Sequence, residues 1–318
     1  MPLRVEAGQK GREEMSGIVL VTGAAGGRQG STGRQVAELL LGRGVPVRAF
    51  VHSDDERAER LRGVGAEVVT GDLRDIAQVL PALEGVDRVF FTYPVADGLL
   101  DAAAAVAAAA KTHGVRRVVE VSQLTPRPHS HSPRTRQHWL AEQVFDWANV
   151  GAVHLRSIVF YENFRVLATI GLATGELAVP LGDEHNLMPL VAAGDVARIG
   201  ATLLADPLPP SEQFYLLVGA VPTVGEIAAA FAKVLDRPMP YRNISEQEWR
   251  DSALARGVNP HAVEHLSRLW QVFRDPEIRK EALYEVTDSV ERVTGSAPES
   301  LEGFLRANRD ALMSGAQR

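Results

Sequence analysis

The sequence predicts an α/β fold with a doubly wound parallel sheet and a smaller, mostly helical C-terminal part. Two observations support this expectation. Short, almost continuously apolar segments alternate with segments of helical periodicity through the first half of the 318 residues, a pattern typical of parallel strands covered by helices on both faces. The first apolar segment, Ile18–Thr22, leads directly into a glycine-rich loop and an amphipathic segment, which is the order found at the start of Rossmann folds.

The individual elements follow from the same patterns. Apolar runs predict strands at 18–22, 46–51, 67–70, 88–92, 117–122 and 153–155, and helical periodicity predicts helices at 34–43, 55–64, 76–83, 99–114 and 133–148. Farther along, we expect helices at 160–174, 195–204 and 224–235, an extended piece at 175–182, a strand at 214–218 and mostly helix from 245. The chain then divides into a mobile tail at 1–14, a nucleotide-binding domain at 15–158 joined by the strand at 214–218, and a C-terminal substrate lobe at 159–318.

Composition excludes several classes of function. The formal net charge is −6, whereas proteins that bind nucleic acid usually carry a basic face. The chain has no cysteine, so disulfides and thiolate catalysis are excluded. The apolar tract at 102–110 is too short to cross a bilayer and is expected to be a helix packed against the sheet. We therefore expect a cytoplasmic protein that acts on a small molecule, without a membrane or nucleic-acid partner; a homodimer is compatible with this composition.

The glycine-rich loop is expected to bind the pyrophosphate of a dinucleotide. Glycines let backbone N–H groups approach the phosphates, and the N-terminus of the following helix favours their negative charge. The loop has five glycines where the short fingerprint needs three. Either Gly33 is the third glycine and residues 27–30 are an insertion, or Gly30 is the third glycine. The predicted contacts come from Gly23, Ala25, Gly26, Arg28, Gly30, Ser31, Thr32 and Gly33.

The ends of the next strands indicate which dinucleotide binds. An acidic residue after the second strand would bind a ribose 2′-hydroxyl and repel a 2′-phosphate, but His52 and Ser53 stand there. Together with Arg28 in the loop, they favour NADP(H), with NAD(H) as the alternative. For His52 the competing interpretation is a solvent-exposed strand end. Further cofactor contacts are expected after the third and fourth strands, from Asp72, Leu73, Thr92, Tyr93 and Pro94.

A series of motifs resembles the NmrA-like family of atypical short-chain dehydrogenases/reductases. The segment Phe160-Tyr-Glu-Asn163 and its spacing from Arg156 are the most specific of them. It is accompanied by the glycine loop and by Gly71-Asp-Leu73, His138-Trp-Leu-Ala-Glu142, His154-Leu-Arg156, Pro189-Leu-Val191, Asp195-Val-Ala197 and Thr287-Asp-Ser-Val290. The resemblance covers residues 16–313. It implies an NAD(P)-binding domain with a small C-terminal lobe, in a family that contains both NADPH-dependent reductases and dinucleotide sensors.

The resemblance also indicates where catalytic residues are expected. Reductases of the wider superfamily use a serine and a Tyr-x-x-x-Lys pair, in which the lysine lowers the pKa of the tyrosine. Ser122 stands at the serine position, whereas Arg134 and His138 replace the tyrosine and the lysine. We expect Ser122, His138 and Tyr161 to act in catalysis and to touch the cofactor.

The missing pair leaves two main functions open, with an isomerase or lyase that retains its nucleotide as a third alternative. The first is an NADP(H)-dependent reductase of a small apolar or aromatic acceptor. The second is a non-catalytic, redox-sensing regulator that binds NAD(P) and acts through a protein partner. Two further histidines, His129 and His131, lie in the loop at 125–133 and are candidate proton donors. They lack a third ligand at useful spacing, so no metal site is predicted.

Overall fold

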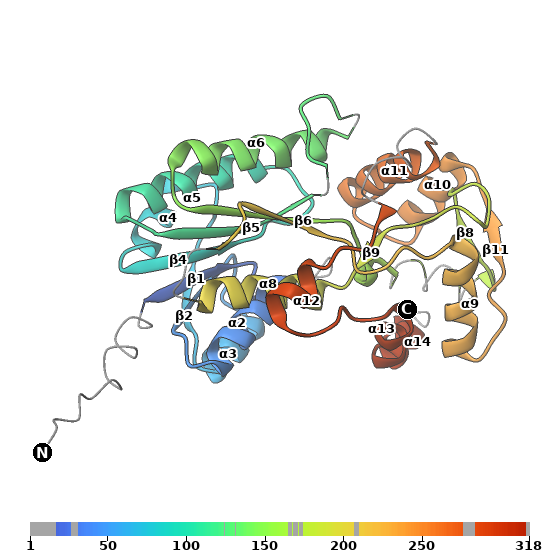
Figure 1. Cartoon of the computed structure of the whole chain (residues 1–318), viewed down its shortest axis with the longest axis horizontal. Helices are drawn as coiled ribbons and strands as arrows, with labels where there is room; N and C mark the ends of the chain where they lie inside the picture. The colour runs from blue at the N-terminus through green and yellow to red at the C-terminus, as the bar shows by residue number, and fades with distance from the viewer. Residues whose placement is uncertain are drawn as a thin grey trace, which may run out of the picture.

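The computed structural model describes residues 17–26, 31–123, 125–130, 132–164, 167, 171, 174–206, 210–275 and 284–315. A central sheet carries helices on both faces, and a second group of helices lies beside it (Figure 1). The sheet has seven strands in the order β10-β6-β5-β4-β1-β2-β3, and every neighbouring pair is parallel. This is the doubly wound order of Rossmann folds, so the predicted fold class is confirmed.

The strands begin and end close to the predicted positions. They are β1 (Ile18–Thr22), β2 (Val47–Val51), β3 (Glu67–Thr70), β4 (Val86–Phe91), β5 (Arg117–Gln123), β6 (Ala152–Ser157) and β10 (Phe214–Leu217). Their side chains are almost all buried along β1, β4 and β5, because these strands lie in the middle of a sheet that is covered on both faces.

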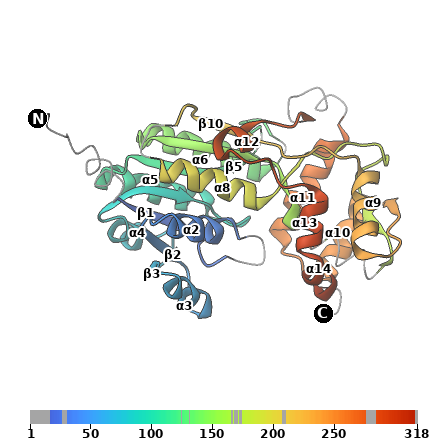
Figure 2. The ribbon, with the colours of Figure 1, turned by 60° about the horizontal axis from the view of Figure 1, so that its bottom comes forward.

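Different helices cover the two faces of the sheet, as Figures 1 and 2 show. One face carries α4 (Ile76–Ala82), α5 (Leu99–His113) and α6 (Pro133–Ala148). The other carries α2 (Thr32–Gly42), α3 (Glu56–Gly63), α8 (Ala193–Ala205) and α12 (Ser289–Thr294). The alanines of α5 are mostly buried, so this helix packs closely against the sheet as expected. Among the described residues, no helix is both long enough and apolar enough to span a membrane.

The C-terminal part has its own apolar core. It contains α9 (Val224–Leu235), α10 (Glu246–Ala255), α11 (Pro260–Arg274), α13 (Leu301–Ala307), α14 (Arg309–Gly315) and two short sheets, in which β8 (Leu177–Val179) pairs with β11 (Tyr241–Asn243) and β7 (Val159–Phe160) with β9 (Leu190–Val191). Its core is built around large aromatic side chains, among them Phe164, Phe231, Trp249, Trp270 and Phe304.

Two features of the second half of the chain are less simple than one continuous helical lobe after β6. The helix predicted at 160–174 does not begin there: Phe160 belongs to β7, and Tyr161–Asn163 is a 3-10 helix. Several of the remaining residues of that segment lie outside the described part of the chain. In addition, α8 and β10 belong to the main sheet layer, so the chain returns to the sheet after β9.

Candidate functional site

The glycine loop has the geometry of a close strand–helix junction. Gly23 and Gly26 have φ angles of +64° and +66°, which favour glycine. A Cβ atom on Gly33 would lie 2.4 Å from the carbonyl oxygen of Thr22, so only glycine lets α2 approach β1 this closely. Close helix–strand packing is the role of the third glycine of the dinucleotide fingerprint. The geometry thus favours Gly33 over Gly30 for that position.

The Ser31 side chain leaves the first turn of α2 without a cap. Ser31 precedes this helix, but its side chain does not cap a backbone N–H group; instead its Oγ accepts a hydrogen bond of 2.7 Å from Gln35 Nε2. The free N–H groups of the first turn can therefore donate to an anion. Thr32 is buried at the start of the helix, and Ala25 is half-buried before the loop. Two of the predicted contacts, Arg28 and Gly30, lie outside the described residues.

The ends of β1 and β4 are tied together by two hydrogen bonds. Thr22 Oγ1 donates to the carbonyl oxygen of Thr92, and the Thr92 N–H donates back to Thr22 Oγ1, both over 2.8 Å. The following residues turn toward α5: the Tyr93 hydroxyl donates to the carbonyl oxygen of Asp97 over 3.1 Å, while Pro94 is exposed. This places Thr92 and Tyr93 at the carboxyl edge of the sheet, as predicted for residues that line a cofactor.

An arginine that the sequence did not single out reaches the glycine loop. Arg57, in the first turn of α3, donates from Nη1 to the carbonyl oxygen of Gly26 over 3.2 Å. Its Nε and Nη2 atoms donate to the carboxylate of Asp55, at distances of 2.6 to 3.2 Å. The hydrogen bonds from Arg57 hold the pKa of Asp55 down at about 2. His52 and Ser53 are exposed at the end of β2. Arg57 brings a positive charge to this edge of the loop, next to the carbonyl oxygen of Gly26.

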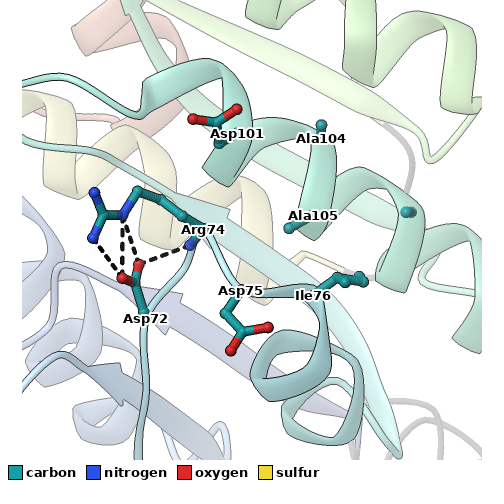
Figure 3. A pocket seen from close by; sticks show the side chains of 8 residues that line it. Asp72, Arg74, Asp75, Ile76, Asp101, Ala104 and Ala105 are labelled. Carbon is teal, nitrogen blue, oxygen red and sulfur yellow. Dashed lines mark hydrogen bonds and ion pairs between the residues drawn. The ribbon is translucent and has the colours of Figure 1, made fainter.

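Asp72 occupies the corresponding position after β3. Its carboxylate accepts hydrogen bonds of 3.0 and 2.6 Å from Arg74 Nε and Nη2, and these bonds lower its pKa to about 2. Leu73 beside it is half-buried. Figure 3 shows the ion pair at the rim of an open pocket of about 630 Å³ between α4 and α5. The pocket is lined by Asp72, Arg74, Asp75, Ile76, Asp101, Ala104, Ala105 and Ala108.

Ser122, at the end of β5, carries an unpaired buried hydroxyl. The residue is 1% exposed, and its Oγ has no hydrogen-bond partner in the described part of the chain. An unpaired buried hydroxyl costs about 1–3 kcal/mol, and a ligand that hydrogen-bonds to it would recover that cost. The residues present therefore fit a dinucleotide that crosses the carboxyl edge of the sheet from the glycine loop to β5.

A group of polar side chains joins α6 to α11 beside the end of β5. We name it the α6–α11 polar cluster; it consists of Gln123, Arg134, Thr135, His138, His261 and His265. Arg134 donates to the carbonyl oxygen of Ala96, to Gln137 Oε1, to Asp97 Oδ1 and to His261 Nδ1, over 2.8 to 2.9 Å. Arg134 thus connects the two parts of the molecule, and its guanidinium does not give up a proton at neutral pH.

The second half of the cluster surrounds Gln123. Its Oε1 accepts a hydrogen bond of 2.8 Å from Thr135 Oγ1, and its Nε2 lies 3.1 Å from His265 Nε2. Burial lowers the pKa of His138 to about 3, with smaller contributions from His265 and Arg134. Burial likewise lowers the pKa of His265 to about 4. Both imidazoles are therefore neutral at pH 7. His138 was predicted as a site residue from the sequence, whereas His265 was not.

The Tyr161 ring lies in the core of the C-terminal part, whereas the sequence predicts that it touches the cofactor and acts in catalysis. Its side chain is fully buried, and its hydroxyl donates to the carbonyl oxygen of Glu299 over 3.3 Å. The ring packs against Phe164 and Phe304, with centroids 6.2 and 5.3 Å apart. The chain turns into a 3-10 helix directly after β7, and this turn directs the ring into the core of the C-terminal part. His129 is exposed, and His131 lies outside the described residues.

Two of the sequence motifs meet in a buried ionic network behind this edge. His154 Nδ1 lies 2.6 Å from Glu120 Oε1, and its Nε2 lies 3.1 Å from Asp146 Oδ1. Beside them, Arg156 donates to both carboxylate oxygens of Glu142 over 2.7 and 3.0 Å. Ligand-type atoms of Glu120, Glu142 and His154 lie within 4.8 Å of one another. Each of these groups already has a hydrogen-bond partner, so the network is a structural link between β5, β6 and α6.

Comparison with known proteins shows similarity along nearly the whole chain. The chain is 27% identical over 298 residues to an NAD(P)H azoreductase of Xenophilus azovorans, covering 93% of this chain and 99% of that protein. The structure of Citrobacter sp. triphenylmethane reductase complexed with NADP(H) superposes with a TM-score of 0.77 at 21% identity, covering 91% of this chain and 99% of that one. NmrA, a negative transcriptional regulator in complex with NADP, superposes with a TM-score of 0.73 at 18% identity, covering 92% and 95%.

The family itself is shown by a match to a family model over most of the chain. The NmrA-like family model matches residues 15–305. That range includes the glycine loop, the end of β5 and the α6–α11 polar cluster described above. The chain is therefore a member of the NmrA-like family.

Proposed function

We propose that this protein is an NADP(H)-dependent reductase of a small apolar or aromatic acceptor. Gly23, Gly26 and Gly33, with the uncapped first turn of α2, would hold the pyrophosphate. Asp72 would accept from the adenine amino group, and Ser122 would hydrogen-bond near the nicotinamide. NADPH, when bound, supplies a hydride. These residues would bind and orient the reactants. Binding and orientation are the main contributions that a protein makes to hydride transfer.

Arg57 supports the preference for NADP(H). Its guanidinium is positioned by Asp55 and lies at the carbonyl oxygen of Gly26, beside the strand end where a ribose 2′-phosphate is recognised in this type of fold. A guanidinium pairs with phosphate through charge-assisted hydrogen bonds. We therefore assign Arg57 to the 2′-phosphate, in addition to His52, Ser53 and Arg28, which the sequence predicts.

The unpaired hydroxyl of Ser122 is the observation that carries the reductase proposal. It stands at the serine position of the family's reductases, and its burial without a partner is explained by a ligand at the end of β5. We propose that residues 159–318 supply the substrate side through α11, which contacts the same edge through Gln123 and Arg134. The azo and triphenylmethane substrates named for the two similar enzymes indicate the classes of acceptor to examine.

Two measurements test the proposal. Calorimetric titration with NADPH, NADP⁺, NADH and NAD⁺ identifies the preferred cofactor, and tighter binding of NADPH than of NADH is expected. Loss of absorbance at the nicotinamide band with methyl red, an azo dye, and with crystal violet, a triphenylmethane dye, measures turnover. The proposal fails if none of a panel of azo, triphenylmethane, quinone and enone acceptors oxidises NADPH.

A redox-sensing regulator is the second candidate, and a specific observation favours it. Arg134 and His138 replace both members of the Tyr-x-x-x-Lys pair, and NmrA shares this fold with NADP bound. A regulator should bind oxidised cofactors at least as tightly as reduced ones and should turn over no acceptor. The same two measurements therefore separate the candidates.

A further inference from the structure

One buried ring nitrogen beside the end of β5 has no hydrogen-bond partner among the described residues. His265 lies on α11, one helical turn after His261, and is only 8% exposed. Its Nδ1 atom has no hydrogen-bond partner in the part of the chain that the structure describes. Burying an unpaired polar group is destabilising, so a group of this kind needs an explanation. A donor that is left free in the resting protein is suited to a ligand.

The contacts of Gln123 determine which nitrogen of His265 carries the hydrogen. In the structure, Gln123 Oε1 accepts a hydrogen bond of 2.8 Å from Thr135 Oγ1, and its Nε2 faces His265. Gln123 Nε2 lies 3.1 Å from His265 Nε2. In this orientation of the amide, His265 Nε2 is the acceptor, because an NH₂ group only donates. The ring hydrogen is then on Nδ1, which is the atom without a partner.

The environment keeps this imidazole neutral. Burial lowers the pKa of His265 to about 4, and the positive charge of Arg134 contributes to the same shift. A neutral imidazole can still donate its N–H to an atom on which negative charge develops, and enzymes that polarise a carbonyl group use histidines in this way.

We propose that His265 is a catalytic residue whose Nδ1–H donates a hydrogen bond to the electron-accepting nitrogen or oxygen of the substrate. This inference rests on the reductase function proposed above. It assigns to α11 the donor that the family's tyrosine would supply from α6. Arg134, which stands at that position, is held by four hydrogen bonds to groups of the protein and is not directed to a substrate.

The chemistry of an azo substrate shows what the donor does. One nitrogen of the N=N bond accepts the hydride supplied by NADPH, and the π electrons move to the other nitrogen. His265 donates to that second nitrogen as it becomes negatively charged, and keeps its own proton. The nitrogen then takes a proton from water, so the product R–NH–NH–R′ contains one hydride and one proton. A triphenylmethane dye differs, because a hydride adds to the carbon of a cation and no atom becomes negatively charged.

This difference gives a direct test with two substitutions at one position. His265→Gln places an amide near the position of Nε2 and can keep the contact with Gln123, but it has no donor near Nδ1. His265→Asn places an amide nitrogen near Nδ1. With methyl red and NADPH, H265Q should lower kcat about 100-fold, as removal of one donor to a developing anion does elsewhere, whereas H265N should stay within about tenfold of the unmodified protein. With crystal violet, both variants should stay within about threefold.

Several outcomes would overturn the inference. They are an equal loss of activity with both dyes, equal losses for H265Q and H265N, and an unchanged rate for H265Q with methyl red. His185→Gln, at a side chain that is 82% exposed, serves as the control for handling and expression. If crystal violet is not reduced by the unmodified protein, the difference in kcat between H265N and H265Q with methyl red tests the inference.

A measurement that needs no turnover separates this inference from the proposed function. If the protein reduces neither methyl red nor crystal violet, this result counts against the proposed reductase function. Nitrogen-15 NMR of the full chain then tests the assignment of His265 independently of turnover. The Nδ1–H tautomer should be present at neutral pH, and its resonance should shift when methyl red is added to the complex with NADP⁺. An Nε2–H tautomer, or an unchanged resonance with methyl red bound, contradicts the assignment.

Discussion

Replacing Arg57 with alanine should weaken the binding of NADPH without weakening that of NADH. The guanidinium is already positioned by three contacts to Asp55 and one to the carbonyl oxygen of Gly26, so little ordering is needed when a phosphate binds. A hydrogen bond to a charged group contributes about 1.5–3 kcal/mol. The Arg57 side chain is 42% exposed, and screening by solvent brings the expected value to the lower end, about 1.5 kcal/mol. Since about 1.4 kcal/mol is a factor of ten, the Kd for NADPH should rise roughly tenfold.

The assay is calorimetric titration of Arg57→Ala with both reduced cofactors. Arg62→Ala is the matched control, because Arg62 lies on the same helix but pairs with Asp54 and Glu59. That variant should bind both cofactors like the unmodified protein. The loss for Arg57→Ala should shrink as salt is added, since exposed charges are screened. Equal losses for NADPH and NADH, or an unchanged Kd for NADPH, would refute the assignment of Arg57 to the 2′-phosphate.

Three further predictions concern stability and the junction of the two parts. Burial raises the pKa of Glu120 to about 7, and the pKa of His154, which burial lowers, is raised on balance by its bond to Glu120. Both groups hold protons more tightly in the folded than in the unfolded chain, so the free energy of unfolding should fall as pH rises from about 5 through 7. Urea titrations of Glu120→Gln should show a smaller fall of this free energy over the same pH range. Gly33→Ala should lower the free energy of unfolding by about 1–3 kcal/mol and weaken NADPH binding. Gly42→Ala, whose added Cβ would meet nothing within 4 Å, should leave the stability unchanged or raise it. Equal melting temperatures for the two variants would contradict this prediction. Arg134→Ala should speed amide hydrogen exchange in α11 but not in β1, and unchanged exchange in α11 would show that Arg134 does not hold the junction.

The fold could be predicted because its signals are local. Each strand is a short apolar run, each helix has its own periodicity, and the alternation of the two determines a parallel sheet. The sequence left Gly33 and Gly30 as alternatives for the third glycine, and the contact of Gly33 with the carbonyl oxygen of Thr22 favours Gly33. The sequence also places Ser122 at the end of β5, although its missing hydrogen-bond partner is visible only in the structure.

The residues that were missed depend on contacts between distant segments. Arg57 reaches Gly26, 31 residues earlier, and Gln123 meets His265, 142 residues later. Neither pair leaves a periodic or spaced pattern in the sequence. For Tyr161, the position after a strand suggested the edge of the sheet, but the sequence does not reveal the 3-10 turn that directs the ring to Phe164 and Phe304.

The return of the chain to the sheet as β10 affects how relatives of this protein can be recombined. The edge strand β10 and the helices α8 and α12 pack on the nucleotide-binding sheet, although they follow β7 in sequence. A chimera joined at a single point after β6 would separate these elements from the sheet on which they pack. Exchanging residues 158–192, 219–288 and 296–315 as three segments would instead leave the sheet and its covering helices within one parent, and would keep α13 and α14 with the core on which they pack. Substrate preference in this fold should therefore be transferable through three grafted segments and not through one crossover.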